Sequence, residues 1–302
     1  MGKSPRHLLG LQGLGDRAMA DIVARAETIQ ARGARPVCAG QQAVLAFFEP
    51  STRTSTSFAL AFQRLGGQVV MLNVAQSSAQ KGETLHDSLS TLLAMQPHFL
   101  VLRHGQNGGL QPLAAATETS VVNAGDGAGE HPTQALLDAL TVKQIKGRLN
   151  DLTVAIVGDI RHSRVARSNA HLWRQMGSRV VMVAPPELLP DVDDYPFAFF
   201  STDMAQGLKK ADVIITLRLQ KERLEKQLTI SADDYHIRYG MDHEKLSYAA
   251  PDAVVLHPGP MNRGVEISST LADDATRCAV LRQVTNGVAT RMAVFEWLTH
   301  AA

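Results

Sequence analysis

Short apolar runs alternate along this chain with longer amphipathic segments. Near the amino terminus, five apolar residues recur at the three- and four-residue spacing of one helix face: Met19, Ile22, Val23, Ala26 and Ile29. This spacing predicts a helix, with Asp16 as its N-cap. Ala43–Phe48, in contrast, is a continuous apolar run with the length of a buried strand.

The same alternation continues to the end of the chain. Further strands are predicted at Gln68–Leu72, Phe99–Leu102, Val121–Val122, Val154–Val157, Val180–Val183, Val213–Thr216 and Ala253–Leu256. Further helices are predicted at Thr52–Leu65, Leu85–Met95, Pro132–Ile145, Val165–Met176 and Asp273–Leu298. The last helix rests on the apolar positions Leu281, Val284, Val288, Met292, Phe295 and Leu298. Apolar strands alternating with helices predict an α/β fold, in which helices cover both faces of parallel sheets.

The length of the chain sets the number of domains to expect. It has 302 residues, about twice the size of an ordinary domain. We therefore expect two α/β domains, each with a central parallel sheet, joined near the Pro132–Ile145 helix. Ligands of such sheets bind beyond the carboxyl ends of the strands, so a polar motif gains weight when it directly follows a strand.

Composition excludes several classes of protein. Lys and Arg number 30 and Asp and Glu 29, a net charge of +1, which argues against chain-wide binding to nucleic acid or an anionic membrane. Cys38 and Cys278 are too few for a disulfide framework or a Cys-rich zinc site. No apolar run approaches the ~20 residues that span a bilayer, and residues 1–10 lack the apolar core of a secretion signal. We expect a cytoplasmic protein that does not associate with a membrane.

The sharpest motif follows the first predicted strand. Ser51, Thr52, Arg53 and Thr54 come directly after Phe47-Phe48-Glu49-Pro50 and open a predicted helix. The unpaired N–H groups and positive dipole end of a helix favour an anion, and hydroxyl and guanidinium donors strengthen the site. The competing interpretation is an ordinary Ser/Thr cap with a solvent-facing Arg. Because several donors follow a fully apolar strand, we favour a phosphate site.

Other polar segments also follow strands of the first half. Ser77 and Lys81 lie in a polar loop, Arg103 ends a strand, and His131 and Gln134 open a helix about one turn apart. A single lysine in a loop or a single histidine is usually structural. Each of these signals is therefore weak when it is taken alone.

The second half carries three such segments. Gly158–Arg164, Leu217–Arg223 and His257–Pro260 each follow an apolar run. Arg164 and Arg218 could hold the two carboxylates of one ligand, because a guanidinium binds a carboxylate through two hydrogen bonds. The alternative is that both arginines are solvated surface residues, and we hold that interpretation for Arg223.

Absent motifs narrow the chemistry. The chain has no G-x-x-x-x-G-K-S/T phosphate loop, and the strand that ends at Val157 is not followed by G-x-G-x-x-G. It also has no H-E-x-x-H motif and no Cys/His cluster for a metal. We expect neither a metal nor a cofactor, and a nicotinamide-dependent dehydrogenase rests only on the α/β alternation.

Taken in order, these segments resemble one family. FFEPSTRTS, the Ser77–Thr84 loop, LRH, HPTQ, GDIRHSRVARS, LRLQKER and HPGPMNRGVEI together resemble the aspartate carbamoyltransferase family over nearly the whole chain. STRT is typical of the wider aspartate/ornithine superfamily, whereas HPTQ and R-x-Q followed by KER are typical of the aspartate branch. The ornithine branch usually carries HPCQ and a Cys-containing HCLP-like segment, and neither is present here.

The resemblance implies a fold and a reaction. The first domain would span residues 1–133 and bind carbamoyl phosphate, with the C-terminal helix 287–302 packing back on it. The second domain, residues 134–286, would bind L-aspartate. The products would be N-carbamoyl-L-aspartate and phosphate, in pyrimidine synthesis.

The resemblance also assigns roles to residues. It places Ser51, Thr52, Arg53, Thr54 and Arg103 on carbamoyl phosphate, with Thr54, Arg103 and His131 at the carbonyl oxygen and Gln134 at the amide end. Ser77 and Lys81 would come from a neighbouring subunit, with Lys81 reaching both substrates. Arg164, Arg218 and Gln220 would hold the aspartate carboxylates, while Pro258, Gly259 and Pro260 would form a wall. The family often has Leu where Gly259 stands.

A shared site implies a homotrimer or a multiple of it, with domains that close over the substrates. Regulatory chains or a dihydroorotase are candidate partners. Two alternatives remain open, a carbamoyltransferase for another amine such as ornithine and a non-catalytic scaffold subunit. Facing arginines disfavour a cationic amine, and a scaffold would have lost Arg or His positions that this chain keeps.

Overall fold

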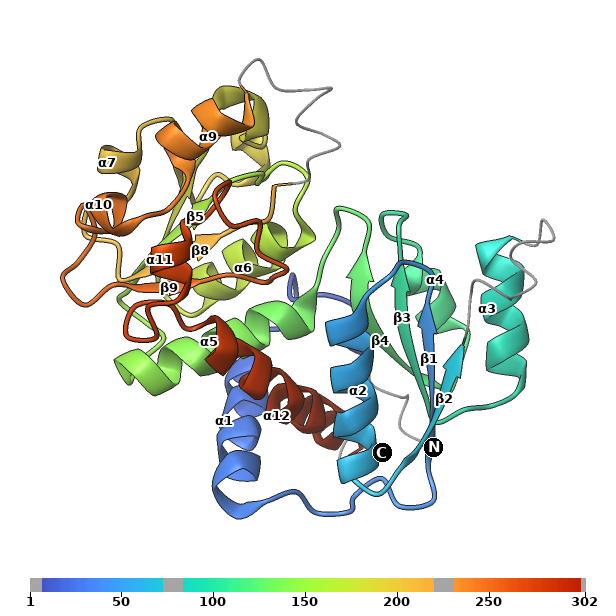
Figure 1. Ribbon diagram of the computed structural model, residues 1–302. Helices are drawn as coiled ribbons and strands as arrows, with labels where there is room; N and C mark the ends of the chain where they lie inside the picture. The colour runs from blue at the N-terminus through green and yellow to red at the C-terminus, as the bar shows by residue number, and fades with distance from the viewer. Residues whose placement is uncertain (1–6, 73–83, 220–230, 300–302) are drawn as a thin grey trace. The chain divides into compact units, whose positions relative to one another are not determined.

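The computed structural model describes residues 7–72, 84–219 and 231–299 (Figure 1). Contacts divide the chain into two compact units, residues 1–140 with 285–302 and residues 141–284. Helices α5 (Pro132–Lys146) and α12 (Val280–Thr299) run across this division. The expected domain boundaries at 133/134 and 286/287 lie inside these two helices. They stay a prediction.

The first unit is built on a parallel sheet of four strands in the order β2-β1-β3-β4. Its elements in chain order are α1 (Asp16–Arg32), β1 (Gln42–Phe47), α2 (Thr52–Arg64), β2 (Gln68–Leu72), α3 (Leu85–Ala94), β3 (Phe99–His104), α4 (Leu110–Ala115) and β4 (Ser120–Asp126). The start of α5 and most of α12 complete it. The polar segments after β1, β3 and β4 therefore meet at one edge of the sheet.

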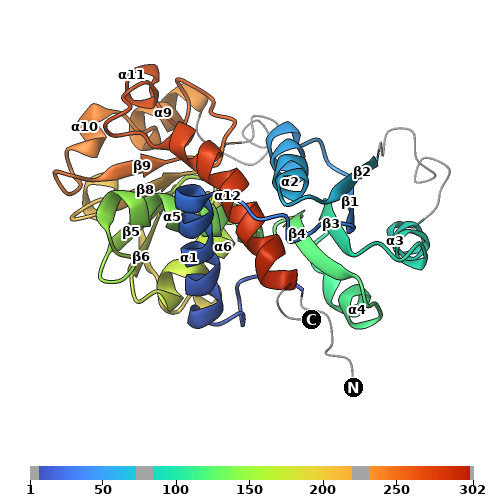
Figure 2. The ribbon, with the colours of Figure 1, turned by 90° about the horizontal axis from the view of Figure 1, so that it is seen from below.

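Helices cover both faces of this sheet (Figures 1 and 2). On one face, α3 and α4 contribute Leu89, Leu110 and Leu113 to a core shared with Val44 and Leu100 of the strands. The opposite face carries α2 and α12. Strands β1, β3 and β4 are thus largely removed from water on both faces, as their continuous apolar sequences require. The edge strand β2 is mostly exposed, with Val70 at 51% and Met71 at 53%.

The C-terminal helix packs on the first unit through aromatic side chains. The Phe295 ring of α12 lies 4.8 Å from Phe62, 5.2 Å from Phe99 and 6.0 Å from Phe58, measured between centroids, all in edge-to-face arrangements. Such pairs are favoured by the ring quadrupoles in addition to the apolar area that they bury. The prediction that the C-terminal helix returns to the N-terminal domain is confirmed.

The second unit has a parallel sheet of five strands in the order β7-β6-β5-β8-β9. Its elements are β5 (Thr153–Val157), α6 (Arg164–Gln175), β6 (Arg179–Val183), β7 (Phe199–Ser201), α7 (Met204–Gly207), β8 (Val213–Thr216), α9 (Ala232–Tyr239), α10 (His243–Leu246), β9 (Val254–Leu256) and α11 (Ser269–Ala272). The predicted class, two α/β domains with parallel sheets flanked by helices, is confirmed.

Two details of the sequence prediction are wrong. Helix α1 buries the five predicted residues, but Gly15 is its N-cap and Asp16 lies in the first turn. The last helix begins at Val280 instead of Asp273: Asp273 is the C-cap of α11, and Cys278 forms a β-bridge with Val255 before α12 starts. Apolar spacing alone could not reveal this interruption.

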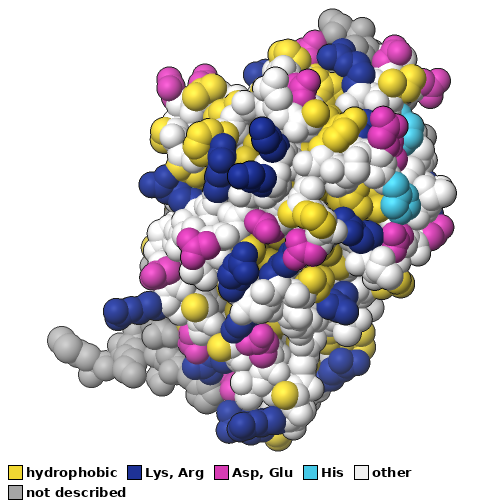
Figure 3. All heavy atoms as spheres, turned by 90° about the vertical axis from the view of Figure 1, so that its left-hand side faces the viewer, with side chains coloured by type: hydrophobic (Ala, Val, Ile, Leu, Met, Phe, Trp, Pro, Cys, Tyr) yellow, Lys and Arg dark blue, Asp and Glu magenta, His cyan; other side chains and the backbone are white. Residues whose placement is uncertain are grey.

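Charged side chains of both signs are mixed on the surface. Lys and Arg are interspersed with Asp and Glu over most of the face in Figure 3. Among the described residues, no helix is long and apolar enough to cross a membrane, and no group of three His, Cys, Asp or Glu could hold a metal ion.

Candidate active site

The loop after β1 and the start of α2 form the centre of the candidate site in the first unit. Ser51 is the N-cap of α2, yet its side chain makes no capping hydrogen bond. The first turn carries no acidic residue, so its backbone N–H groups and dipole face no carboxylate of their own helix. Thr54 is 8% exposed, while Thr52 and Arg53 are exposed. The competing interpretation expected a Ser/Thr cap, which Ser51 does not make, and a solvent-facing Arg, which Arg53 is. The uncapped helix start suits an anion.

Arg103 lies at the same edge of the sheet. It pairs in register with Phe47 of β1, and its carbonyl accepts a hydrogen bond from the Phe48 N–H at 2.8 Å. The Nε atom of Arg103 donates to Oε2 of Glu49 at 3.3 Å. Glu49 thus orients the guanidinium, a role that the sequence analysis did not assign.

Asp126 organises the loops after β3 and β4. Its carboxylate, 6% exposed, accepts hydrogen bonds from the Gly108 N–H at 3.1 Å and the Glu130 N–H at 2.5 Å. These bonds tie the segment after Arg103 to the segment before His131. Sequence analysis missed Asp126, although a carboxylate at a strand end beside several glycines is a recognisable signal.

His131 and Gln134 are both held at the start of α5. Their exposed fractions are 4% and 7%, and the Gln134 N–H donates to the His131 carbonyl at 3.0 Å. Because His131 follows β4 and Arg103 is the penultimate residue of β3, the order of the strands puts them at the edge where α2 begins. The first unit therefore has, at one edge, those residues predicted for carbamoyl phosphate that the structure describes.

Three predicted site residues lie outside the described part of the chain. They are Ser77, Lys81 and Gln220. Their roles stay predictions that rest on the sequence.

The second unit places two predicted arginines beyond neighbouring strands. Arg164 is the first residue of α6, after the N-cap Ser163, whose hydroxyl accepts from the Ala166 N–H at 3.1 Å. Arg218 is exposed and follows β8, which pairs with β5. The loop after β5 is braced by Asp159, which lies 2.8 Å from Nδ1 of His162. Parallel neighbours end at the same edge, so both arginines belong to it.

The His257–Pro260 segment follows β9, the next strand of that sheet. Nδ1 of the buried His257 accepts a hydrogen bond from the Gly259 N–H at 2.8 Å, so Nε2 carries the proton and donates to Oε1 of Glu266 at 3.1 Å. Gly259 has a φ of +63°, which a leucine adopts only with strain. The position where the family often has Leu therefore suits glycine in this chain.

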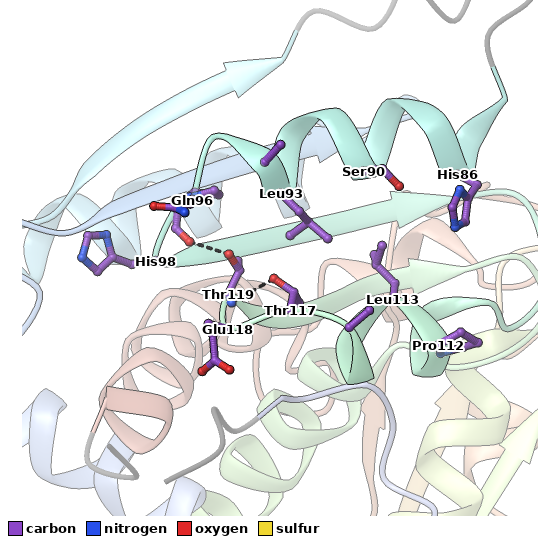
Figure 4. A pocket seen from close by; sticks show the side chains of 13 residues that line it. His86, Ser90, Leu93, Gln96, His98, Pro112, Leu113, Thr117, Glu118 and Thr119 are labelled. Atoms are coloured by element: carbon purple, nitrogen blue, oxygen red, sulfur yellow. Dashed lines mark hydrogen bonds between the residues drawn. The ribbon is translucent and has the colours of Figure 1, made fainter. Parts of the chain in front are cut away.

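A second feature of the first unit lies elsewhere. A groove of about 780 Å³ runs between α3 and α4, lined at its two ends by His86 and His98 (Figure 4). Among the described residues, none of those predicted for the site lines it. The groove is therefore distinct from the part of the candidate active site that the structure describes.

Family models match both halves of the chain. The carbamoyl-phosphate-binding domain of aspartate/ornithine carbamoyltransferases matches residues 6–144, and the Asp/Orn-binding domain matches residues 150–298. The chain belongs to the aspartate/ornithine carbamoyltransferase family.

Curated relatives at about 50% identity are aspartate carbamoyltransferase catalytic subunits. The aspartate carbamoyltransferase catalytic subunit of Acidiphilium cryptum is 51% identical over 302 residues, covering 98% of this chain and 97% of the relative. That of Parvibaculum lavamentivorans is 49% identical, covering 97% and 91%. The structure is also similar to aspartate transcarbamoylase from Trypanosoma cruzi in complex with carbamoyl phosphate, with a TM-score of 0.87, 30% identity and coverage of 97% and 95%.

Proposed function

We infer that this chain transfers the carbamoyl group of carbamoyl phosphate to the amine of L-aspartate. The products are N-carbamoyl-L-aspartate and phosphate, as in pyrimidine biosynthesis. The uncapped N-terminus of α2, flanked by Thr54 and Arg103, is the observation that carries this inference. The names of relatives near 50% identity support the same activity.

Carbamoyl phosphate belongs to the first unit in this proposal. Its phosphate accepts hydrogen bonds from the helix N–H groups and from the side chains of Ser51, Thr52, Arg53, Thr54 and Arg103. The carbonyl oxygen contacts Thr54, Arg103 and His131, and the amide end contacts Gln134. Helix donors and guanidinium groups suit a dianionic phosphate because both carry positive charge or partial charge.

L-Aspartate belongs to the second unit. Arg164, Arg218 and Gln220 hold its two carboxylates, and residues 258–260 form the wall near the reacting groups. The hydrogen bond from Asn262 Nδ2 to the Leu219 carbonyl, 2.9 Å long, supports this arrangement because it ties the wall segment to the Arg218 segment.

The chemistry needs donors and no protein nucleophile. The aspartate amine attacks the carbamoyl carbon, the C–O bond to phosphate breaks, and the leaving phosphate takes the amine proton. Negative charge grows on the carbonyl oxygen, where losing one preorganised donor typically costs ~10²–10³ in rate. Holding both substrates in contact supplies much of the remaining acceleration. His131 acts here as a neutral donor.

The assembly is part of the same proposal. Ser77 and Lys81 come from a neighbouring subunit, so the active form is a homotrimer or a multiple of it, in the cytoplasm. Regulatory chains or a dihydroorotase are its candidate partners.

Turnover with different amines tests the function. The purified chain is given carbamoyl phosphate with L-aspartate or with L-ornithine, and product is measured by mass. We expect N-carbamoyl-L-aspartate and little citrulline, because Arg164 and Arg218 repel a cationic side chain. Preference for ornithine, or no turnover with either amine, would overturn the inference.

A further inference from the structure

A buried hydrogen bond fixes the orientation of the Gln134 side chain. Nε2 of Gln134 donates to Oδ1 of Asp138 at 2.9 Å, one turn further along α5. Asp138 is fully buried, and Gln134 is 7% exposed. An ionised carboxylate only accepts hydrogen bonds, so the amide nitrogen must face Asp138. The amide oxygen, Oε1, is then presented at the other end of the side chain.

A buried arginine of α12 supplies the charge opposite to the Asp138 carboxylate. Burial and the nearby Arg103 lower the pKa of Arg291, and the carboxylate of Asp138 opposes them by raising it. Nη1 of Arg291 donates to the Gly287 carbonyl at 3.1 Å, and a side chain at Gly287 would approach that nitrogen to 2.7 Å. Since buried charges require opposite charge nearby, the arginine of α12 stabilises the anion on α5.

We propose that Asp138 is a positioning residue that holds Gln134 with its amide oxygen toward the substrate and so selects a carbamoyl group over acyl groups that lack an N–H. The proposal rests on the proposed function, in which Gln134 meets the amide end of carbamoyl phosphate. Gln134 Oε1 accepts a hydrogen bond from that NH₂. An amide turned the other way would present its own NH₂ to the substrate NH₂, and neither group could accept.

Acetyl phosphate is the matched probe, because it differs from carbamoyl phosphate by a methyl group in place of NH₂. Contacts to the phosphate and the carbonyl oxygen are common to both molecules and cancel in the ratio of their affinities. A methyl group leaves Oε1 without a donor in a buried site, which typically weakens binding about 10- to 100-fold. We expect the unchanged protein to show a preference of that size.

Substitution of Asp138 tests the mechanism of this preference. Asn can present its NH₂ as well as its oxygen to Gln134, so in Asp138→Asn the glutamine amide is no longer held in one orientation and the preference for carbamoyl phosphate falls. Gln134→Ala also removes the preference, and adding Asp138→Asn to it changes the ratio no further. Affinity for inorganic phosphate stays unchanged throughout. An unchanged ratio in Asp138→Asn would overturn the proposal.

Asp126→Asn is the matched control. It makes the same chemical change at another buried carboxylate of this unit, one that accepts loop N–H groups at 2.5 and 3.1 Å. Loosening those loops lowers turnover but affects the carbonyl and phosphate contacts of both ligands alike. The ratio therefore stays as in the unchanged protein, and a fall equal to that of Asp138→Asn would contradict the assignment to Asp138.

Two further measurements keep the test decisive. If Asp138→Asn fails to fold, Asp138→Asn with Arg291→Met removes both buried charges together, and the preference must fall in that variant as well. Equal affinity of the unchanged protein for both phosphates would overturn the proposal without any variant. Absence of turnover with carbamoyl phosphate and L-aspartate would instead overturn the proposed function.

Discussion

The Nε atom of Arg103 donates a hydrogen bond to Oε2 of Glu49 over 3.3 Å, at the edge where β1 and β3 end. A carboxylate beside a phosphate site weakens the attraction for the anion. It also holds one edge of the guanidinium, which reduces the rotamer entropy lost when a ligand binds. Glu49 therefore lowers the affinity for phosphate somewhat, and it fixes the direction of the Arg103 guanidinium.

Removal of Glu49 tests this balance. We expect Glu49→Ala to lower kcat about 10-fold, because Arg103 no longer points steadily at the carbonyl oxygen, while the affinity for inorganic phosphate stays equal or rises. Steady-state kinetics and phosphate titration measure the two effects. Glu244→Ala, at an exposed position of α10, serves as the control and leaves both unchanged. A loss of phosphate affinity in Glu49→Ala would contradict the orienting role.

His131 is expected to act as a donor and not as a base. His131→Gln keeps an N–H donor, so kcat falls about 10- to 100-fold while the pH–rate profile keeps its shape. The profile is recorded for both proteins with saturating substrates. Loss of one limb of the profile in the variant would show that His131 carries a catalytic proton.

Shared active sites are tested by mixing inactive subunits. Arg53→Ala and Lys81→Ala chains are each inactive alone, but after exchange a mixed trimer contains a site with an intact Arg53 and an intact Lys81 from different chains. Up to about a third of the wild-type activity per trimer then returns, as one site in three is repaired. Full subunit exchange, verified by native mass spectrometry, without recovered activity would refute the shared site.

The stability of the fold at acidic pH depends on Asp274. Hydrogen bonds from Thr276 and then His243 lower the pKa of Asp274 from 3.8 to about 2. A carboxyl with a depressed folded-state pKa stabilises the fold above its ordinary pKa, and this contribution is lost as pH falls toward 2. The Tm of Asp274→Asn should lie below that of the unchanged protein at pH 6, and the gap should close on acidification. A gap independent of pH would contradict this origin.

Local pattern was enough to predict most of the fold. The five apolar positions of α1 are all buried, and β2 and β8 begin and end where the sequence places them. Short elements such as α4 and α7 escaped because four to six residues show too little periodicity. The start of α12 was missed because Cys278 pairs with Val255 of β9 just before the helix begins, a contact that no spacing reveals.

Candidate site residues could be predicted from the sequence where their charge or donors are complementary to an anionic ligand. Arginines, hydroxyls and His131 point to an anion by their own chemistry. Glu49, Asp126 and Asp138 carry the same charge as the ligand, so their residue type does not suggest a role beside it, and only the position of Asp126 at a strand end among glycines is a signal. Their partners lie far away in the sequence or one helical turn further, and only the fold shows which donor each carboxylate holds.

The central claim is that the start of α2 binds the phosphate and polarises the carbonyl, and a pair of substitutions on this helix tests it most directly. Thr54 is buried at the site, whereas Thr56 is exposed on the same helix. Thr→Val keeps the shape of each side chain and removes one hydroxyl. We predict that Thr54→Val lowers the kcat for N-carbamoyl-L-aspartate formation about 10²- to 10³-fold, while Thr56→Val leaves it unchanged. Equal rates in the two variants would contradict the account.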